Sequence, residues 1–268
     1  MFHSPPHYSP ENAKLLVTVQ RWFGTSGNGM NKRKHLFCLV LISLLSYPFV
    51  AFCDPGYFRV STEARERTKA IRTLGILFVD MKVYELTAGD VREPKEDWTE
   101  AARRNFSNAL KAELKERLIE AKVLGPESAS EELDDVQTLY KAVRDAILTH
   151  TYGAALNWNF FPEKLNHFDY ALGPVDGLLT RLNVDGLLLM TASDEISTGG
   201  RKALMVVGVF TGVVPRSGIT WANAALVDGS GSILWFSPNP GKAYDLREAD
   251  DVSTLVGRML NEFPVPKR

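Results

Sequence analysis

The sequence predicts an α/β protein with a single three-layer domain, in which helices flank a mixed β-sheet and a C-terminal β-hairpin precedes a closing helix. Two near-continuous apolar runs, at 74–79 and 186–190, are typical of strands buried on both faces. Amphipathic helical patterns separate these runs along the chain, and a glycine-rich turn joins two apolar segments near the C-terminus.

The N-terminal part has the layout of a secretory signal peptide at residues 30–53. Met30 opens a short basic stretch, and an uncharged run from Leu36 to Phe52 follows it, with the helix breaker Pro48 near its end. An uncleaved membrane anchor is the alternative, because the run is close to the length that spans a bilayer. We expect translation to start at Met30, so that 1–29 is an extension outside the natural protein. The rest of the chain is then exported to the periplasm.

Cysteine use bears on the same question. The chain has two cysteines, Cys38 and Cys53, and both lie in the predicted signal peptide. Cys53 is a candidate for lipidation, although Phe52 is larger than the residue that normally precedes a lipidated cysteine. Cleavage after Cys53 is the other interpretation, since Ala51 and Cys53 supply the small residues this needs. Residues 54–268 contain no cysteine, which excludes a disulfide, a thiol nucleophile and a zinc–thiolate site there.

Residues 54–72 are polar and charged, and we expect a tether that leads into a domain at 73–268. The segment 73–86 is the first central strand. A helix follows, opened by Asp97 with Glu100 three residues later, a pair able to cap free backbone N–H groups. Apolar residues recur on one stripe of this helix, namely Trp98, Ala102, Phe106, Leu110, Leu114 and Leu118.

The middle of the chain predicts a short strand at 121–126 and a second amphipathic helix at 128–150. The apolar face of that helix consists of Val136, Leu139, Tyr140, Val143 and Ile147. The segment 151–173 is rich in aromatic residues without a clean period, so we expect a surface insertion. Pro174 fits the first turn of a third helix, and Asn183 fits its left-handed cap.

The last third predicts a strand at 184–192, a hairpin at 219–237 and a final helix at 250–263. The hairpin turn is Asp228-Gly229-Ser230-Gly231, in which glycines supply the positive φ angles of a tight turn. The final helix places an apolar residue at every third or fourth position and must therefore pack on the sheet.

The body of the chain is mildly acidic. The whole chain has 31 basic and 32 acidic residues, but residues 1–53 contribute five of the basic ones and one acid. Nucleic-acid binding depends on clustered Lys and Arg, so this composition argues against it.

Several acidic and histidine side chains have the chemistry of catalytic or metal-binding groups. Acidic residues near predicted strand ends could form a pair for acid–base catalysis, although such residues more often form turns or caps. A metal site could come from the insertion, but no ligand spacing supports it. We therefore expect no catalytic, metal or cofactor site. The acidic candidates are Asp80, Asp185, Asp194 and Glu195, and the metal candidates are His150, His167, Asp169 and Asp176.

The segment 203–215 has thirteen residues without a charge, between Arg201-Lys202 and Arg216. It is too short for a membrane-spanning helix but long enough for a strand of a membrane barrel. Packing in the core or against another subunit is the favoured alternative. Candidate residues for membrane or partner contact are Val206, Val207, Gly208, Val209, Phe210 and Gly212.

Three motifs resemble bacterial envelope proteins of the CsgG-like type, related to the curli secretion lipoprotein, and the N-terminal domain of TolB. These motifs are "LGILFVD" (74–80), "NVDGLLLM" (183–190) and "ALVDGSGSILWF" (225–236). The resemblance covers about residues 73–263 and implies an exported or lipidated protein with a role in assembly or transport. It carries over no functional residue, and the insertion at 151–173 has no counterpart.

Together these observations predict a non-enzymatic envelope protein that works through contacts with other envelope proteins or with itself, near a membrane. The alternatives are a periplasmic hydrolase or small-ligand-binding protein that uses the acidic strand ends, and a pore-forming oligomer that uses 203–215.

Overall fold

The sheet is organised around two long parallel strands, β2 (Thr73–Leu86) and β5 (Gly186–Ser197). The computed structural model describes residues 58–87, 89, 91–152, 161, 163–197, 219–239, 244–265 and 267. In this part the sheet has seven strands in the order β1-β7-β6-β5-β2-β3, and β4 also pairs with β2. The remaining strands are β1 (Arg59–Val60), β3 (Arg92–Pro94), β4 (Glu120–Val123), β6 (Thr220–Val227) and β7 (Ile233–Asn239).

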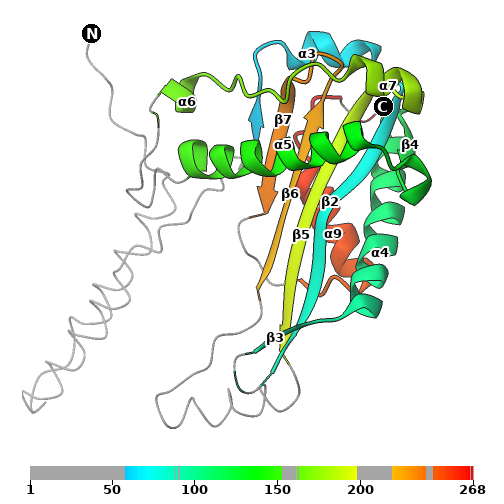
Figure 1. The fold of residues 1–268 in the computed structure, drawn as a ribbon, viewed down its shortest axis with the longest axis vertical. Coiled ribbons are helices and arrows are strands. Elements are labelled where there is room, and N and C mark those ends of the chain that lie inside the picture. The colour runs from blue at the N-terminus through cyan, green and yellow to red at the C-terminus, as the bar shows by residue number, and fades with distance from the viewer. Residues whose placement is uncertain are drawn as a thin grey trace, which may run out of the picture. The chain divides into compact units, whose positions relative to one another are not determined.

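Helices cover both faces of the sheet (Figure 1). Helices α4 (Glu96–Lys115) and α9 (Ala249–Met259) pack on one face, and α5 (Glu131–Ile147) and α7 (Asp176–Leu182) pack on the other. The remaining helical segments are α3 (Ala64–Arg67), η1 (Thr68–Ala70), η2 (Pro126–Ser128), η3 (Leu148–Tyr152) and α6 (Glu163–Asn166).

Alternation along the central strands builds two cores. In β2, Ile76 and Phe78 belong to the core under α4 and α9, whereas Leu77 and Val79 belong to the core under α5 and α7. Successive side chains of a strand point to opposite faces, so a strand buried on both sides must be apolar throughout. The mixed sheet with helices on both faces confirms the predicted three-layer α/β class.

Most predicted elements occur where the sequence places them. The predicted strand 73–86 matches β2, and the hairpin and final helix occur as β6, β7 and α9. Asn183 has φ 53° and ψ 57°, so the predicted left-handed cap is confirmed. Pro174 lies before the N-cap Val175 of α7, outside the first turn that was predicted for it.

The first long helix differs from its prediction at both ends. It begins at Glu96, and its N-cap residue is Lys95, whose side chain makes no capping hydrogen bond. The predicted capping role of Asp97 is therefore wrong. Asp97 instead lies in the first turn, where its charge interacts favourably with the helix dipole. The helix ends at Lys115, and Leu118 has φ 58° and is 63% exposed. Leu118 therefore does not extend the buried stripe, and Leu139 of α5 is likewise exposed.

Residues 58–72 belong to the folded domain, which corrects the predicted tether over that range. Strand β1 pairs with β7, and Ala64, Thr68 and Ile71 are buried. Arg67 of α3 forms an ion pair with Asp228 in the turn between β6 and β7. The segment is polar because its outer face meets solvent, while three inward side chains hold it against the sheet.

The described part of the predicted insertion is attached to the domain. Tyr152, Phe168 and Tyr170 pack on the core under α5 and α7, and Ala171 forms a β-bridge with Ser232. Among the described helices, none is long and apolar enough to cross a membrane.

Candidate functional site

Of the four acidic candidates, Asp80 has a different position from the one predicted. Asp80 does not end a strand: β2 runs on to Leu86, and the pairing with β5 shifts register between Phe78 and Asp80. This irregularity leaves Asp80 exposed in the middle of the strand. Asp185 precedes β5, and its Oδ2 accepts hydrogen bonds from the backbone N–H groups of Arg72 and Thr73, both at 2.8 Å. Asp185 therefore fixes the start of β2.

Glu195 is buried in β5, and its carboxylate forms an ion pair with Arg92 of β3 at 3.0 Å. The guanidinium of Arg92 also lies over the ring of Tyr84 in β2, 5.4 Å from its centroid. These contacts join β3 and β5 across β2. Glu195 thus has a role in holding the sheet together.

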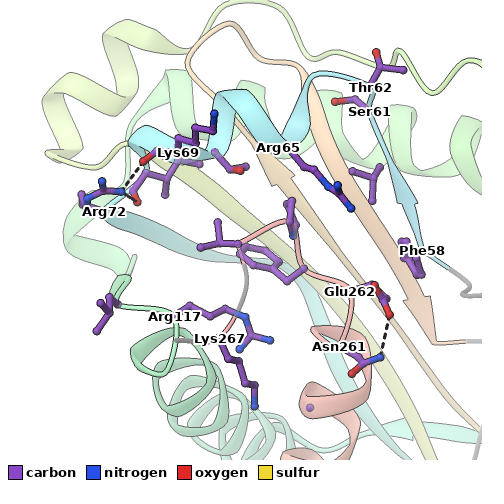
Figure 2. Close-up of a pocket in the computed structure, with 18 residues that line it drawn as sticks. Phe58, Ser61, Thr62, Arg65, Lys69, Arg72, Arg117, Asn261, Glu262 and Lys267 are labelled. Atoms are coloured by element: carbon purple, nitrogen blue, oxygen red, sulfur yellow. Dashed lines mark hydrogen bonds between the residues drawn. The ribbon is translucent and has the colours of Figure 1, made fainter.

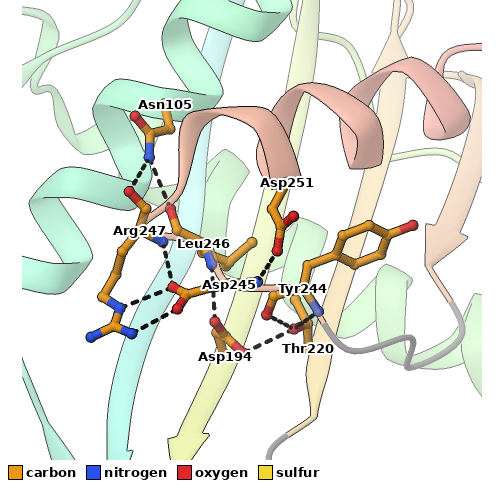
Figure 3. Close-up of polar contacts among 8 residues, drawn as sticks. All are labelled: Asn105, Asp194, Thr220, Tyr244, Asp245, Leu246, Arg247 and Asp251. Atoms are coloured by element: carbon orange, nitrogen blue, oxygen red, sulfur yellow. Dashed lines mark hydrogen bonds and ion pairs between the residues drawn. The ribbon is translucent and has the colours of Figure 1, made fainter.

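Asp194 is the most buried of the acidic candidates, with 1% of the residue exposed. Its Oδ2 accepts a hydrogen bond from the backbone N–H of Leu246 at 3.1 Å, and its Oδ1 lies 2.9 Å from Thr220 Oγ1. Thr220 Oγ1 also accepts from the N–H of Tyr244 at 3.0 Å and lies 2.7 Å from the Tyr244 carbonyl. We call Asp194, Thr220, Tyr244 and Leu246 the Asp194 network (Figure 3).

Burial raises the pKa of Asp194 from 3.8 to about 6, and the nearby carboxylate of Asp245 contributes in the same direction. The hydrogen bonds from Leu246 and Thr220 and the charge of Arg247 act the opposite way but do not compensate for the burial. A carboxyl group in such surroundings keeps its proton to higher pH, because desolvation penalises the charged form.

A second set of contacts holds the turn at 244–248 in place. Arg247 donates from Nε and Nη2 to the two carboxylate oxygens of Asp245, at 2.9 and 2.6 Å. Asn105 of α4 donates to the backbone carbonyls of Leu246 and Arg247, at 3.1 and 2.9 Å (Figure 3). The turn is therefore attached to α4 as well as to β5 and β6.

The Asp194 network lies at the base of the segment that connects β5 to β6. Asp194 and Thr220 face each other in the antiparallel register of these strands, and the chain between Ser197 and Thr220 includes the uncharged stretch 203–215. Trp221, the next residue of β6, is 53% exposed. The network therefore fixes the two strands from which this segment departs.

The candidate metal ligands do not come together. His150 packs against the ring of Phe161 at 4.7 Å, and Asp169 pairs with Lys164 at 2.5 Å. Asp176 lies at the start of α7, where it lines a small pocket of about 380 Å³ together with Asp185. Across the part of the chain that the structure describes, no group of three potential metal ligands occurs.

A larger pocket, of about 1470 Å³, lies where the start of the described chain meets the ends of α4 and α9 (Figure 2). Arg65, Lys69 and Arg72 lie along one side, and Arg117 and Lys267 lie across from them. We call this the basic pocket. No local sequence signal predicts it, because its basic residues come from three segments that are far apart in the chain. Its apolar lining includes Phe58, Val60, Ile71, Phe263 and Val265.

The predicted lipidation site and the predicted membrane or partner contacts lie outside the part of the chain that the structure describes. These residues are Cys53, Val206, Val207, Gly208, Val209, Phe210 and Gly212.

Comparison with known proteins gives a loose structural likeness. No family model matches the chain, and no curated protein matches it. Among solved structures, a PelC dodecamer from Paraburkholderia phytofirmans has 10% sequence identity and a TM-score of 0.35, covering 79% of this chain and 97% of that chain. A substituted form of the same dodecamer, in a second crystal form, has 10% identity and a TM-score of 0.33, covering 74% and 89%. The resemblance to CsgG-like proteins stays a prediction.

Proposed function

We propose that this chain is an exported protein of the bacterial cell envelope that acts by binding other envelope proteins, or further copies of itself, and not by catalysis. The observation that carries the proposal is the Asp194 network at the base of the 198–218 connection. The network holds β5 and β6 together at that point, so their connection starts and ends on a rigid support.

A contact segment benefits from such a support. Binding costs less free energy when the chain that makes the contact is held in place beforehand. The stretch 203–215 supplies apolar side chains without a charge, which is the composition that gains most from being covered by a partner. The exposed Trp221 lies beside it in sequence and offers the kind of large aromatic side chain that often anchors an interface.

The roles of the acidic residues support binding over catalysis. An acid or base in catalysis must reach a proton on the substrate. Asp185 accepts two backbone N–H groups, Asp194 is buried in its network, and Glu195 pairs with Arg92. Each of these three carboxylates thus has a structural partner within the fold.

Export to the envelope follows from the predicted signal peptide at 30–53, and the intact mass of the mature protein tests it. A chain that starts at Cys53 and carries acyl chains would show a lipoprotein, and an unmodified start at Asp54 would show a periplasmic protein. A start at Met30 would show a retained anchor. Recovery of the uncleaved, unmodified protein from the cytoplasmic fraction alone would contradict export.

Site-specific photocrosslinking tests the contact segment. A photoreactive amino acid is placed at Val207 or Phe210 in the full chain, and at the exposed Val91, in a different loop, as the control. We expect discrete crosslinked species from the first two positions in cells, and none of these species from Val91. If both test positions give only uncrosslinked, folded and exported protein, the proposed contact is wrong.

Charge substitution complements the crosslinking. Val207→Asp and Val209→Asp place charges in the uncharged stretch, and we expect both to abolish the crosslinked species formed from Phe210. Leakage of vesicles caused by the original chain, and lost in these variants, would instead favour the pore-forming alternative.

A further inference from the structure

The basic pocket combines two chemical features along one groove. Basic side chains line two of its sides (Figure 2), and its lining also includes apolar side chains, among them Ile71 and Phe263. Among the described residues that line it, Glu262 is the only acidic one, and it accepts a hydrogen bond from Asn261. A ligand that matches this lining has an anionic group attached to an apolar part.

The basic residues differ in how far their charges are already compensated. Lys69 pairs with Glu66, Arg117 pairs with Glu113, and Lys267 pairs with both Glu113 and Glu116. These three charges are therefore partly neutralised within the fold. Arg65 and Arg72 differ, because within the described part of the chain neither has a carboxylate partner.

The two uncompensated guanidinium groups are suited to a phosphate. The Nη1 of Arg72 donates to the carbonyls of Lys69 and Ile71, at 2.7 and 2.8 Å, which holds the side chain in place and leaves its other N–H groups available. Arg65 is exposed on α3, seven residues earlier, and Lys69 lies between the two arginines along this side of the pocket (Figure 2). Arginine binds phosphate oxygens through paired N–H groups, and further basic side chains along the same side of a pocket add to its attraction for an anion.

The start of the described chain places this groove near a membrane if residue 53 is anchored. Phe58, the first described residue, lines the groove and lies five residues after Cys53. Five residues span at most about 18 Å. A retained apolar run or a lipidated Cys53 would therefore hold the groove within reach of lipid headgroups.

We infer that the basic pocket binds the headgroup of an anionic phospholipid, with the basic side formed by Arg65, Lys69 and Arg72 attracting the phosphate and the apolar lining receiving the start of the acyl chains. This inference rests on the proposed export for the source of the lipid, but it does not depend on the 203–215 contact. The two can therefore fail separately.

Titration of the full chain in neutral dodecyl maltoside micelles tests the inference. The probes are dihexanoyl phosphatidylglycerol, dihexanoyl phosphatidylcholine and inorganic phosphate, with binding measured by calorimetry. We expect saturable binding of the phosphatidylglycerol, at least tenfold weaker binding of the phosphatidylcholine, and weakening of the first by salt. Equal binding of the two lipids would overturn the inference, and binding of inorganic phosphate with equal affinity would show a free-anion site instead.

Variants assign the binding to the two arginines. Arg65→Gln/Arg72→Gln should weaken phosphatidylglycerol binding at least tenfold. The control, Arg103→Gln/Lys141→Gln, removes the same charge from exposed positions on α4 and α5 and should leave the affinity unchanged. Because Arg72 also bonds to the backbone, Arg65→Gln alone is measured as well, with an expected loss of threefold or more. Unchanged affinity in both arginine variants would overturn the inference.

Discussion

At the scale of single residues, burial raises the pKa of Asp194, and the hydroxyl of Thr220 beside it has to satisfy more than one acceptor. Thr220 Oγ1 has one proton but lies within hydrogen-bond distance of two acceptors, Asp194 Oδ1 and the Tyr244 carbonyl. When Asp194 is ionised, one of these two contacts has no proton. When Asp194 is protonated, its own O–H donates to Thr220 Oγ1, and the Thr220 hydroxyl donates to the Tyr244 carbonyl. The network is therefore complete only with a neutral group at position 194.

This arrangement predicts that Asp194→Asn stabilises the protein at neutral pH. An amide can donate to Thr220 and accept from Leu246 without a charge. The pKa of Asp194 is raised from 3.8 to about 6, so its contribution to stability is greatest below about pH 4 and is lost as the pH rises through 6. The loss is about 3 kcal/mol at most. We expect the variant to gain about 1–3 kcal/mol over the original chain at pH 7.5 and much less at pH 4.5.

Urea unfolding at the two pH values measures this difference. Asp135→Asn, on the exposed face of α5, is the matched control and should change the free energy of unfolding by less than about 0.5 kcal/mol at either pH. An equal pH dependence in the Asp194 variant and the original chain would show that the pKa of Asp194 is not raised.

At the scale of elements, the length of a helix or strand determines whether the sequence predicts it. The strand 73–86 and the final helix carry many apolar residues in a clear pattern, and the structure has both. Strand β1 and helix α3 have two and four residues, which is too short for any period to be recognised. Their position depends on contacts with β7 and with Asp228, far along the chain. Neighbouring residues carry no signal for such contacts.

The turn between β6 and β7 gives a prediction at this scale. Gly231 has φ 78°, and a Cβ atom there would lie 1.7 Å from the carbonyl oxygen of Gly173. Gly231→Ala therefore strains the turn and pushes away the segment before α7. We expect a loss of at least about 2 kcal/mol in the free energy of unfolding, measured with urea.

Gly229→Ala in the same turn is the control. A Cβ atom at Gly229 would have its nearest neighbour at 3.7 Å, an ordinary contact. We expect a change below about 1 kcal/mol. Similar losses in the two variants would mean that the close approach to Gly173 does not determine the fold of the turn.

At the scale of the whole molecule, the candidate sites were harder to predict than the layers. The sequence identified Asp185, Asp194 and Glu195 by their places near strands, but their partners, among them Leu246 and Arg92, come from distant segments. The basic pocket forms where three separated segments meet, so no sequence motif predicts it. Apolar patterns are repeated many times along a chain, whereas a site depends on a few contacts that only the complete fold creates.

Contacts between distant segments also determine where the folded domain begins. A chain of residues 54–268 retains β1, the Arg67–Asp228 ion pair and the buried side chains of Ala64, Thr68 and Ile71. A chain of residues 73–268 lacks all of them and exposes the part of the core that they cover. We expect the shorter chain to unfold at a clearly lower urea concentration, or to aggregate, while the longer chain unfolds cooperatively.

A point substitution separates this effect from that of truncation itself. Ile71 is 4% exposed and belongs to the core under α4 and α9, so Ile71→Ala in the full chain should lower the free energy of unfolding by about 2–4 kcal/mol. Val91→Ala, at a side chain that is 56% exposed, should change it by less than about 0.5 kcal/mol. If Ile71→Ala behaves like Val91→Ala, and the chain 73–268 is as stable as 54–268, then residues 58–72 act as the tether that their polar composition suggests.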